Sequence, residues 1–109
     1  MRTKSAKAKG RKLQNWVVKQ FVDVWKVDPK DIRPALMGET GKDIHFHERA
    51  GIYYSVECKN QEGFKNVYDA IDQARKNAEE GDFPLVFIKS NNKPPLVIME
   101  AETWFEGID

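Results

Sequence analysis

Apolar side chains recur at three- and four-residue steps in two stretches of the chain, and this spacing predicts two amphipathic helices. The first covers residues 11–26 and ends before Asp28-Pro29, because the residue that precedes a proline disfavours helical geometry. The second covers residues 64–80 and ends at Gly81. The apolar stripe of the first helix consists of Leu13, Trp16, Val17, Phe21 and Val24. That of the second consists of Phe64, Val67, Tyr68, Ile71, Ala74 and Ala78.

Shorter apolar stretches between the two helices and after the second one predict β-strands. Residues 42–46 and 52–59 alternate along the chain, and residues 84–89 form an apolar run typical of a fully buried strand. We also expect a short edge strand at 32–37, a partner strand at 95–100 and a last helical turn at 102–108. This order predicts a single-domain α/β fold, in which a mixed central β-sheet is flanked by helices.

The charges of the 109-residue chain are unevenly distributed. Six of its 18 basic residues lie within the first twelve positions, where no acidic residue occurs, and the remaining chain carries twelve basic and 17 acidic residues. The six are Arg2, Lys4, Lys7, Lys9, Arg11 and Lys12. We therefore expect a flexible basic arm at 1–10 and a folded domain at 11–109. Such an arm either attracts a polyanion, most simply DNA, or only keeps the chain soluble.

The single cysteine, Cys58, excludes a disulfide within the chain. A reducing, cytoplasmic setting fits this composition best. No apolar run approaches the roughly 18 residues that a membrane-spanning helix needs, and no apolar segment follows the basic start. The sequence therefore predicts neither a signal peptide nor a membrane partner.

Charged side chains interrupt two strands that otherwise look buried. Asp43 lies in the strand predicted at 42–46, opposite in direction to Ile44, and Glu57 and Lys59 lie in the strand at 52–59. A two-residue step returns a strand side chain to the same face, so Glu57 and Lys59 project together. If the two strands pair, Asp43 joins them.

Two carboxylates at one point repel each other and are costly to bury unless a cation compensates them. A hard divalent cation such as Mg²⁺ suits oxygen ligands and activates bound water for attack on a phosphodiester. A neighbouring ammonium group, here Lys59, can orient that water and offset transition-state charge. The alternative is that Glu57 and Lys59 form an exposed ion pair of little energetic value.

The motifs Gly41-Lys42-Asp43-Ile44 and Val56-Glu57-Cys58-Lys59 resemble the signature of the PD-(D/E)XK nuclease superfamily. Within it, the sequence is most similar to small phage endonucleases and archaeal-type Holliday junction resolvases. Supporting segments are Lys9-Gly10-Arg11, Gln73-Ala74 and Pro84-Leu85-Val86, so the resemblance spans roughly residues 9 to 100. It implies a restriction-endonuclease-like αβββαβ core and an intracellular protein, including a phage-encoded one in a bacterial host.

The resemblance also implies roles for individual residues. Asp43 and Glu57 would bind Mg²⁺ or Mn²⁺, and the backbone carbonyl of Cys58 would supply a further oxygen ligand. Lys59 would position the attacking water. Gln73 matches a helix-borne glutamine that helps to orient the lysine or a metal-bound water; the alternative is an ordinary polar flank of the helix.

One position departs from the resolvase pattern. Many of these relatives carry a glutamate on the first helix near the metal, whereas this chain has Gln14. An amide oxygen can still contact a metal or its water but contributes no charge. The leading prediction is therefore a metal-dependent DNA endonuclease, acting on branched or junction DNA. The alternative is a catalytically inactive nucleic-acid-binding module on the same fold.

The expected contacts with DNA come from two places. Lys4, Lys7, Lys9, Arg11 and Lys12 would follow the phosphate backbone, and His45 would either contact a phosphate or lie at the surface. A zinc site formed by His45, His47 and Cys58 is disfavoured, because the cysteine faces away and no second cysteine exists. We expect Trp16 and Trp104 to belong to the core rather than to stack on bases. By analogy with the resolvases, the protein would act as a homodimer.

Overall fold

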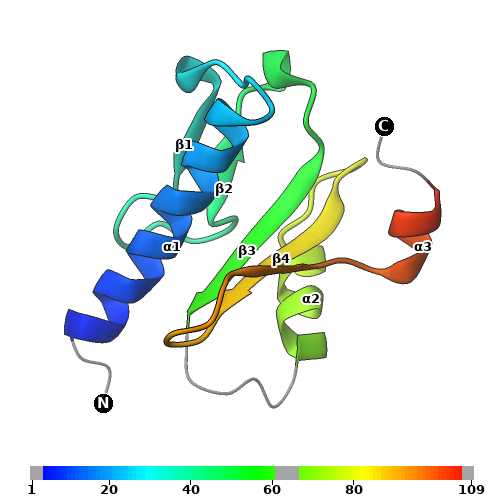
Figure 1. Cartoon of the computed structure of the whole chain (residues 1–109). Coiled ribbons are helices and arrows are strands. Elements are labelled where there is room, and N and C mark those ends of the chain that lie inside the picture. Colours follow the sequence, from blue (N-terminus) through cyan, green and yellow to red (C-terminus); the bar gives the residue numbers. More distant parts are fainter. Residues whose placement is uncertain (1–3, 61–66, 107–109) are drawn as a thin grey trace.

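The computed structural model describes residues 4–60 and 67–106, with side chains from residue 7 onward. The helices are α1 (Lys4–Asp23), α2 (Val67–Lys76) and α3 (Ala101–Phe105), and two single 3₁₀ turns are η1 (Pro29–Asp31) and η2 (Glu48–Ala50). The strands are β1 (Ile32–Pro34), β2 (Ile44–Phe46), β3 (Tyr54–Asn60), β4 (Phe83–Lys89) and β5 (Leu96–Ile98). Figure 1 shows these elements as one layered unit.

The strands form one five-stranded sheet in the order β1-β2-β3-β4-β5. The pairs β1–β2, β2–β3 and β4–β5 are antiparallel, while β3 and β4 run parallel. The parallel pair needs a crossover connection, and α2 provides it. The mixed sheet flanked by helices confirms the α/β fold class predicted from the sequence.

The two long helices cover opposite faces of the sheet (Figure 1). Leu13, Val17 and Phe21 of α1 pack with Ile44 and Val56 in one core cluster. Ala70, Ile71 and Ala74 of α2 pack with Val86 and Ile88 in a second cluster. Because neighbouring strand residues point to opposite faces, the α2 face receives the side chains that alternate with the α1 cluster.

Helix α1 begins at Lys4, so residues 4–10 are helical and the flexible arm expected there is wrong for these residues. Lysine and alanine are good helix formers, and one glycine, Gly10, costs only roughly 1 kcal/mol. Tertiary contacts also hold this turn in place. The side-chain amide of Asn60 donates to the carbonyl of Lys9, at 3.0 Å, and Lys9 Nζ donates to Asn91 Oδ1, at 2.9 Å.

Several apolar side chains that were expected in the core are exposed. Trp16 and Val24 retain 40% and 64% of their surface, because they line an open apolar groove beside β4 and β5 that α1 does not cover. Trp104 retains 63% of its surface. The start of the predicted second helix, 64–66, lies outside the described residues. Among the described helices, none is both long enough and apolar enough to cross a membrane.

Candidate functional site

The side chains of Glu57, Lys59 and Asp43 meet on the α2 face of the sheet. Val56 and Cys58 belong to the core cluster under α1, so Glu57 and Lys59 must point the other way. Asp43 immediately precedes β2, and its backbone N–H donates to the carbonyl of Val56 at 3.0 Å. The short antiparallel pairing of β2 with β3 thus brings together residues separated by a turn and η2.

Glu57 is the most deeply buried charged residue of this group, with 2% of its surface exposed. Its Oε2 lies 3.4 Å from Lys59 Nζ, whereas its Oε1 has no hydrogen-bond partner among the described residues. Burial, and after it the nearby charge of Asp43, raise the pKa of Glu57 to about 7, while Lys59 acts to lower it. A buried carboxylate that lacks donors is costly unless a cation joins it.

Asp43 has one firm partner. Its Oδ2 accepts a hydrogen bond from the backbone N–H of Cys58, at 2.8 Å. Burial raises the pKa of Asp43, and this effect is opposed by the Cys58 N–H and by the charges of Lys59 and His45. The hydrogen bond therefore fixes one carboxylate oxygen against β3, on the strand that carries Glu57.

Lys59 is held between the sheet and α2. Its Nζ donates to the side-chain oxygen of Gln73 at 3.0 Å, while it lies 3.4 Å from Glu57. Gln73 is exposed on α2, in the stripe next to the buried Ala70 and Ala74. The amide thus accepts a hydrogen bond from the ammonium group without neutralising it.

The donor set at this point suits a hard divalent cation. Asp43 and Glu57 offer carboxylate oxygens, one of them a buried orphan. In a strand the N–H and C=O of one residue point to the same side, so the Cys58 carbonyl is directed toward Asp43, like its N–H. In the described part of the chain, no group of three or more His, Cys, Asp or Glu side chains gathers as a metal site. Any metal here would therefore keep several waters, which is typical of Mg²⁺.

Gln14 is not brought to these residues. It lies partly buried on α1, the helix that covers the opposite face of the sheet. Within residues 4–60 and 67–106, no hydrogen bond connects it to Asp43, Glu57 or Lys59. The structure thus gives no support to Gln14 as a metal ligand.

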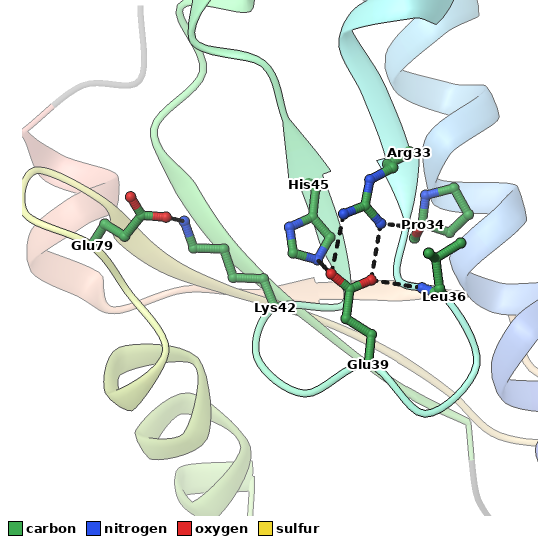
Figure 2. Close-up of polar contacts among 7 residues, drawn as sticks. All are labelled: Arg33, Pro34, Leu36, Glu39, Lys42, His45 and Glu79. Atoms are coloured by element: carbon green, nitrogen blue, oxygen red, sulfur yellow. Dashed lines mark hydrogen bonds and ion pairs between the residues drawn. The ribbon is translucent and has the colours of Figure 1, made fainter.

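The two histidines have separate surroundings. His47 Nδ1 accepts from the backbone N–H of Arg49 at 3.0 Å and so caps the turn η2. His45 lies on the same face as Asp43, and its Nε2 approaches Glu39 Oε2 at 3.3 Å (Figure 2). Glu39 also accepts from both Nη atoms of Arg33. His45 is thus placed beside an ion pair rather than alone at the surface.

The basic residues of α1 border a hollow of about 620 Å³ at the carboxyl end of β3. Lys9 and Lys12 of α1 and Lys89 of β4 line it, together with Asn60 and Asn91. Lys89 Nζ donates only to backbone carbonyls, and in the described part of the chain no carboxylate pairs with any of the three lysines. Lys7 and Arg11 are partly or fully exposed on α1. The side chain of Lys4 lies outside the described residues.

Arg33 and Glu39 are polar residues that the sequence pattern did not single out. Arg33 is the cross-strand partner of His45, and Glu39 lies in the turn between β1 and β2. The sequence pattern predicts which side chains of each strand share a face, but it does not predict which residue of β1 pairs with which residue of β2. The two glycines around Glu39 were the only local signal that this turn is special.

Comparison with family models, with curated proteins and with solved structures found no match to this chain.

Proposed function

We propose that the protein is a metal-dependent endonuclease that hydrolyses phosphodiester bonds in DNA. The observation that carries this proposal is the buried carboxylate of Glu57, which has one oxygen without a donor and lies beside Asp43 and Lys59. When ionised, one buried and one half-buried acid beside a single ammonium group leave an excess of negative charge. A divalent cation would compensate this charge, and the same cation would take part in the hydrolysis of a phosphodiester.

Each residue has a separate task in this proposal. Asp43, Glu57 and the Cys58 carbonyl would hold Mg²⁺ or Mn²⁺, which as a Lewis acid lowers the pKa of bound water and polarises phosphoryl oxygens. Lys59 would donate a hydrogen bond to the attacking water or to a phosphoryl oxygen, which positions the water and offsets the negative charge of the transition state. Gln73 keeps that ammonium in place through its hydrogen bond of 3.0 Å.

A basic hollow at one end of the sheet supports DNA as the substrate. The hollow lined by Lys9, Lys12 and Lys89 lies at the carboxyl end of β3, the strand that carries Glu57 and Lys59. Figure 1 shows the start of α1 and this end of β3 at the same end of the molecule. Unneutralised lysines attract a phosphate backbone regardless of sequence. Branched DNA, a homodimer and an intracellular location follow from the resolvase resemblance and belong to the proposal.

The second candidate is a DNA-binding module without catalysis. Gln14 favours it, because it brings no charge and lies on the helix covering the opposite face of the sheet. The intact set of Asp43, Glu57 and Lys59 favours the nuclease.

The deciding experiment is digestion of linear, nicked, flapped and four-way DNA with Mg²⁺ or Mn²⁺, and with chelator. We expect cleavage by the wild-type protein with metal and none with chelator. Glu57→Ala should lose cleavage but keep DNA binding, while Glu102→Ala, which removes an exposed acid on α3, should cleave as the wild type does. Binding without cleavage of any substrate would favour the second candidate.

A further inference from the structure

The carboxylate of Glu39 is surrounded by nitrogen atoms (Figure 2). Arg33 Nη1 donates to Oε1 at 2.9 Å and Arg33 Nη2 donates to Oε2 at 3.1 Å, so the guanidinium grips both oxygens. The backbone N–H of Leu36 donates to Oε1 at 2.8 Å. These bonds hold the pKa of Glu39 well below its usual range, at about 2. We call Arg33, the Leu36 N–H and His45 the anion cradle.

His45 is the part of the cradle that Glu39 does not satisfy. Its Nε2 lies 3.3 Å from Glu39 Oε2, yet this buried nitrogen has no hydrogen-bond partner among the described residues. A carboxylate has two oxygens in one plane, and both are already engaged by the guanidinium. A phosphate presents oxygens in tetrahedral directions, so it could accept from the Arg33 fork and from the imidazole together.

The cradle lies next to the proposed metal ligands. Arg33 and His45 are directly paired across β1 and β2, and His45 follows Asp43 by two residues. A two-residue step along a strand is about 7 Å and keeps the same face. A group bound in the cradle would therefore lie one strand step from the position of the scissile phosphate.

The two side chains of the cradle and its occupant are carried by different kinds of backbone, while Leu36 lies in the same connection as Glu39. Arg33 and His45 lie on paired strands, whereas Glu39 lies in the exposed turn between Gly38 and Gly41. Both glycines have left-handed φ angles, of 82° and 99°, which other residues rarely adopt. The turn can therefore change conformation without breaking the sheet, and Glu39 would move with it.

We propose that the anion cradle is a subsite for a backbone phosphate of the nucleic acid, next to the scissile one, and that Glu39 occupies it until that phosphate displaces it. The identity of the ligand as a polynucleotide rests on the proposed nuclease function. Glu39 thus lowers the affinity for DNA, because an incoming phosphate must compete with an anion that is already bound.

The test is binding of a fluorescent single-stranded oligonucleotide in chelator, followed by anisotropy, with wild type, Glu39→Ala and Glu39→Gln. We expect both variants to bind about five- to tenfold more tightly, the net value of about one hydrogen bond. Glu39→Gln preserves an acceptor for the Leu36 N–H and so guards against loss of the turn. Adding Arg33→Gln to Glu39→Ala should return the affinity to the wild-type value or below.

The matched control is Glu79→Ala, which removes an equal charge from a neighbouring ion pair, that of Glu79 with Lys42 (Figure 2). If the affinity of Glu39→Ala for the oligonucleotide rises no more than that of Glu79→Ala, the change in net charge alone explains the increase, and the proposed phosphate site is rejected. Inorganic phosphate provides a second probe, through chemical shifts of the Arg33 side chain in Glu39→Ala, and shifts that are unchanged would also reject it. A protein that binds phosphate there but cleaves no DNA would keep the cradle and reject the nuclease.

Discussion

Glu39 and Glu57 are two glutamates near Asp43, and their carboxylates have opposite surroundings. Glu39 lies in an exposed turn and accepts three hydrogen bonds from the Arg33 fork and the Leu36 N–H. Glu57 lies in the central strand β3, is 2% exposed, and has one oxygen without a donor. Accordingly, the pKa of Glu39 falls to about 2 and that of Glu57 rises to about 7.

The two acids differ in their hydrogen bonds: both oxygens of Glu39 have donors within the protein, whereas one oxygen of Glu57 has none among the described residues. The Glu39 carboxylate accepts hydrogen bonds from Arg33 and from the Leu36 N–H, so removing it would free these donors for another anion. One oxygen of the Glu57 carboxylate has no donor among the described residues, and under the proposed function a divalent cation would compensate its charge. An ionisable group with a strongly shifted pKa is a common mark of a functional site, and here the direction of the shift indicates what the site lacks.

The largest expected effect is on cleavage. Glu57→Gln should reduce the cleavage rate with Mg²⁺ by roughly a thousandfold, because it removes a charged ligand of the metal at the reacting centre. The same change should raise the free energy of unfolding at pH 8 in chelator by about 2 kcal/mol, since the neutral amide avoids a buried charge. Digestion kinetics and urea unfolding measure the two effects.

Glu39→Gln is the matched variant for the stability measurement. It should lower the free energy of unfolding, because the amide pairs less well with Arg33. A Glu57→Gln protein that cleaves at the wild-type rate would contradict the assignment of the site.

The next effect concerns pH. Because the pKa of folded Glu57 is raised from 4.5 to about 7, the folded protein retains a proton that the unfolded chain has lost between these values. In chelator, this group's contribution to stability should therefore fall as the pH rises from 4.5 to about 7 and level off above it. Glu39 contributes in the opposite sense: its stabilisation is present above its unfolded pKa and is lost as the pH falls toward 2.

Metal binding should follow the same titration. Protons compete with the metal at Glu57, so the affinity for Mn²⁺ should fall about tenfold per pH unit below pH 7. Calorimetric titration at pH 5.5, 6.5 and 8 measures this. The slope should vanish in Glu57→Gln, and an affinity that is independent of pH in the wild type would refute Glu57 as a ligand.

A smaller effect on the cleavage rate is expected from the residue that holds Lys59, the lysine beside Glu57. Gln73→Ala should slow cleavage about ten- to a hundredfold, since Lys59 loses the acceptor that orients it. Asp72→Ala is the control on the same helix, where the carboxylate pairs with Arg75. Equal rates for Gln73→Ala and the wild type would reduce Gln73 to an ordinary helix flank.

The smallest effect lies in the basic hollow, away from both glutamates. Lys12→Gln should weaken DNA binding and reduce the slope of log affinity against log salt by about one, the loss of one phosphate contact. Lys76→Gln, which alters an exposed lysine on α2, should leave the slope unchanged. If both variants behave alike, the hollow does not bind the backbone.

Local sequence patterns predicted much of the fold, and the features that they did not predict depend on contacts between distant parts of the chain. Alternation placed Ile44 and Phe46 against the core and Glu57 with Lys59 on the other face, because side-chain direction in a strand depends only on position. The exposure of Trp16 and the helical start at Lys4 could not be read in this way. Both depend on where α1 lies against β3, β4 and the turn at Asn91.

The sequence by itself determined the order of the elements, the α/β class and the shared face of Glu57 and Lys59, because helix and strand periodicities are properties of neighbouring residues. Only the tertiary structure decided that Glu57 would be buried with one carboxylate oxygen lacking a donor, and that Glu39 would lie beside Arg33 and His45 of two paired strands. The register of β1 against β2 and the depth of β3 beneath α2 arise from contacts between residues far apart in the chain. No local pattern encodes those contacts.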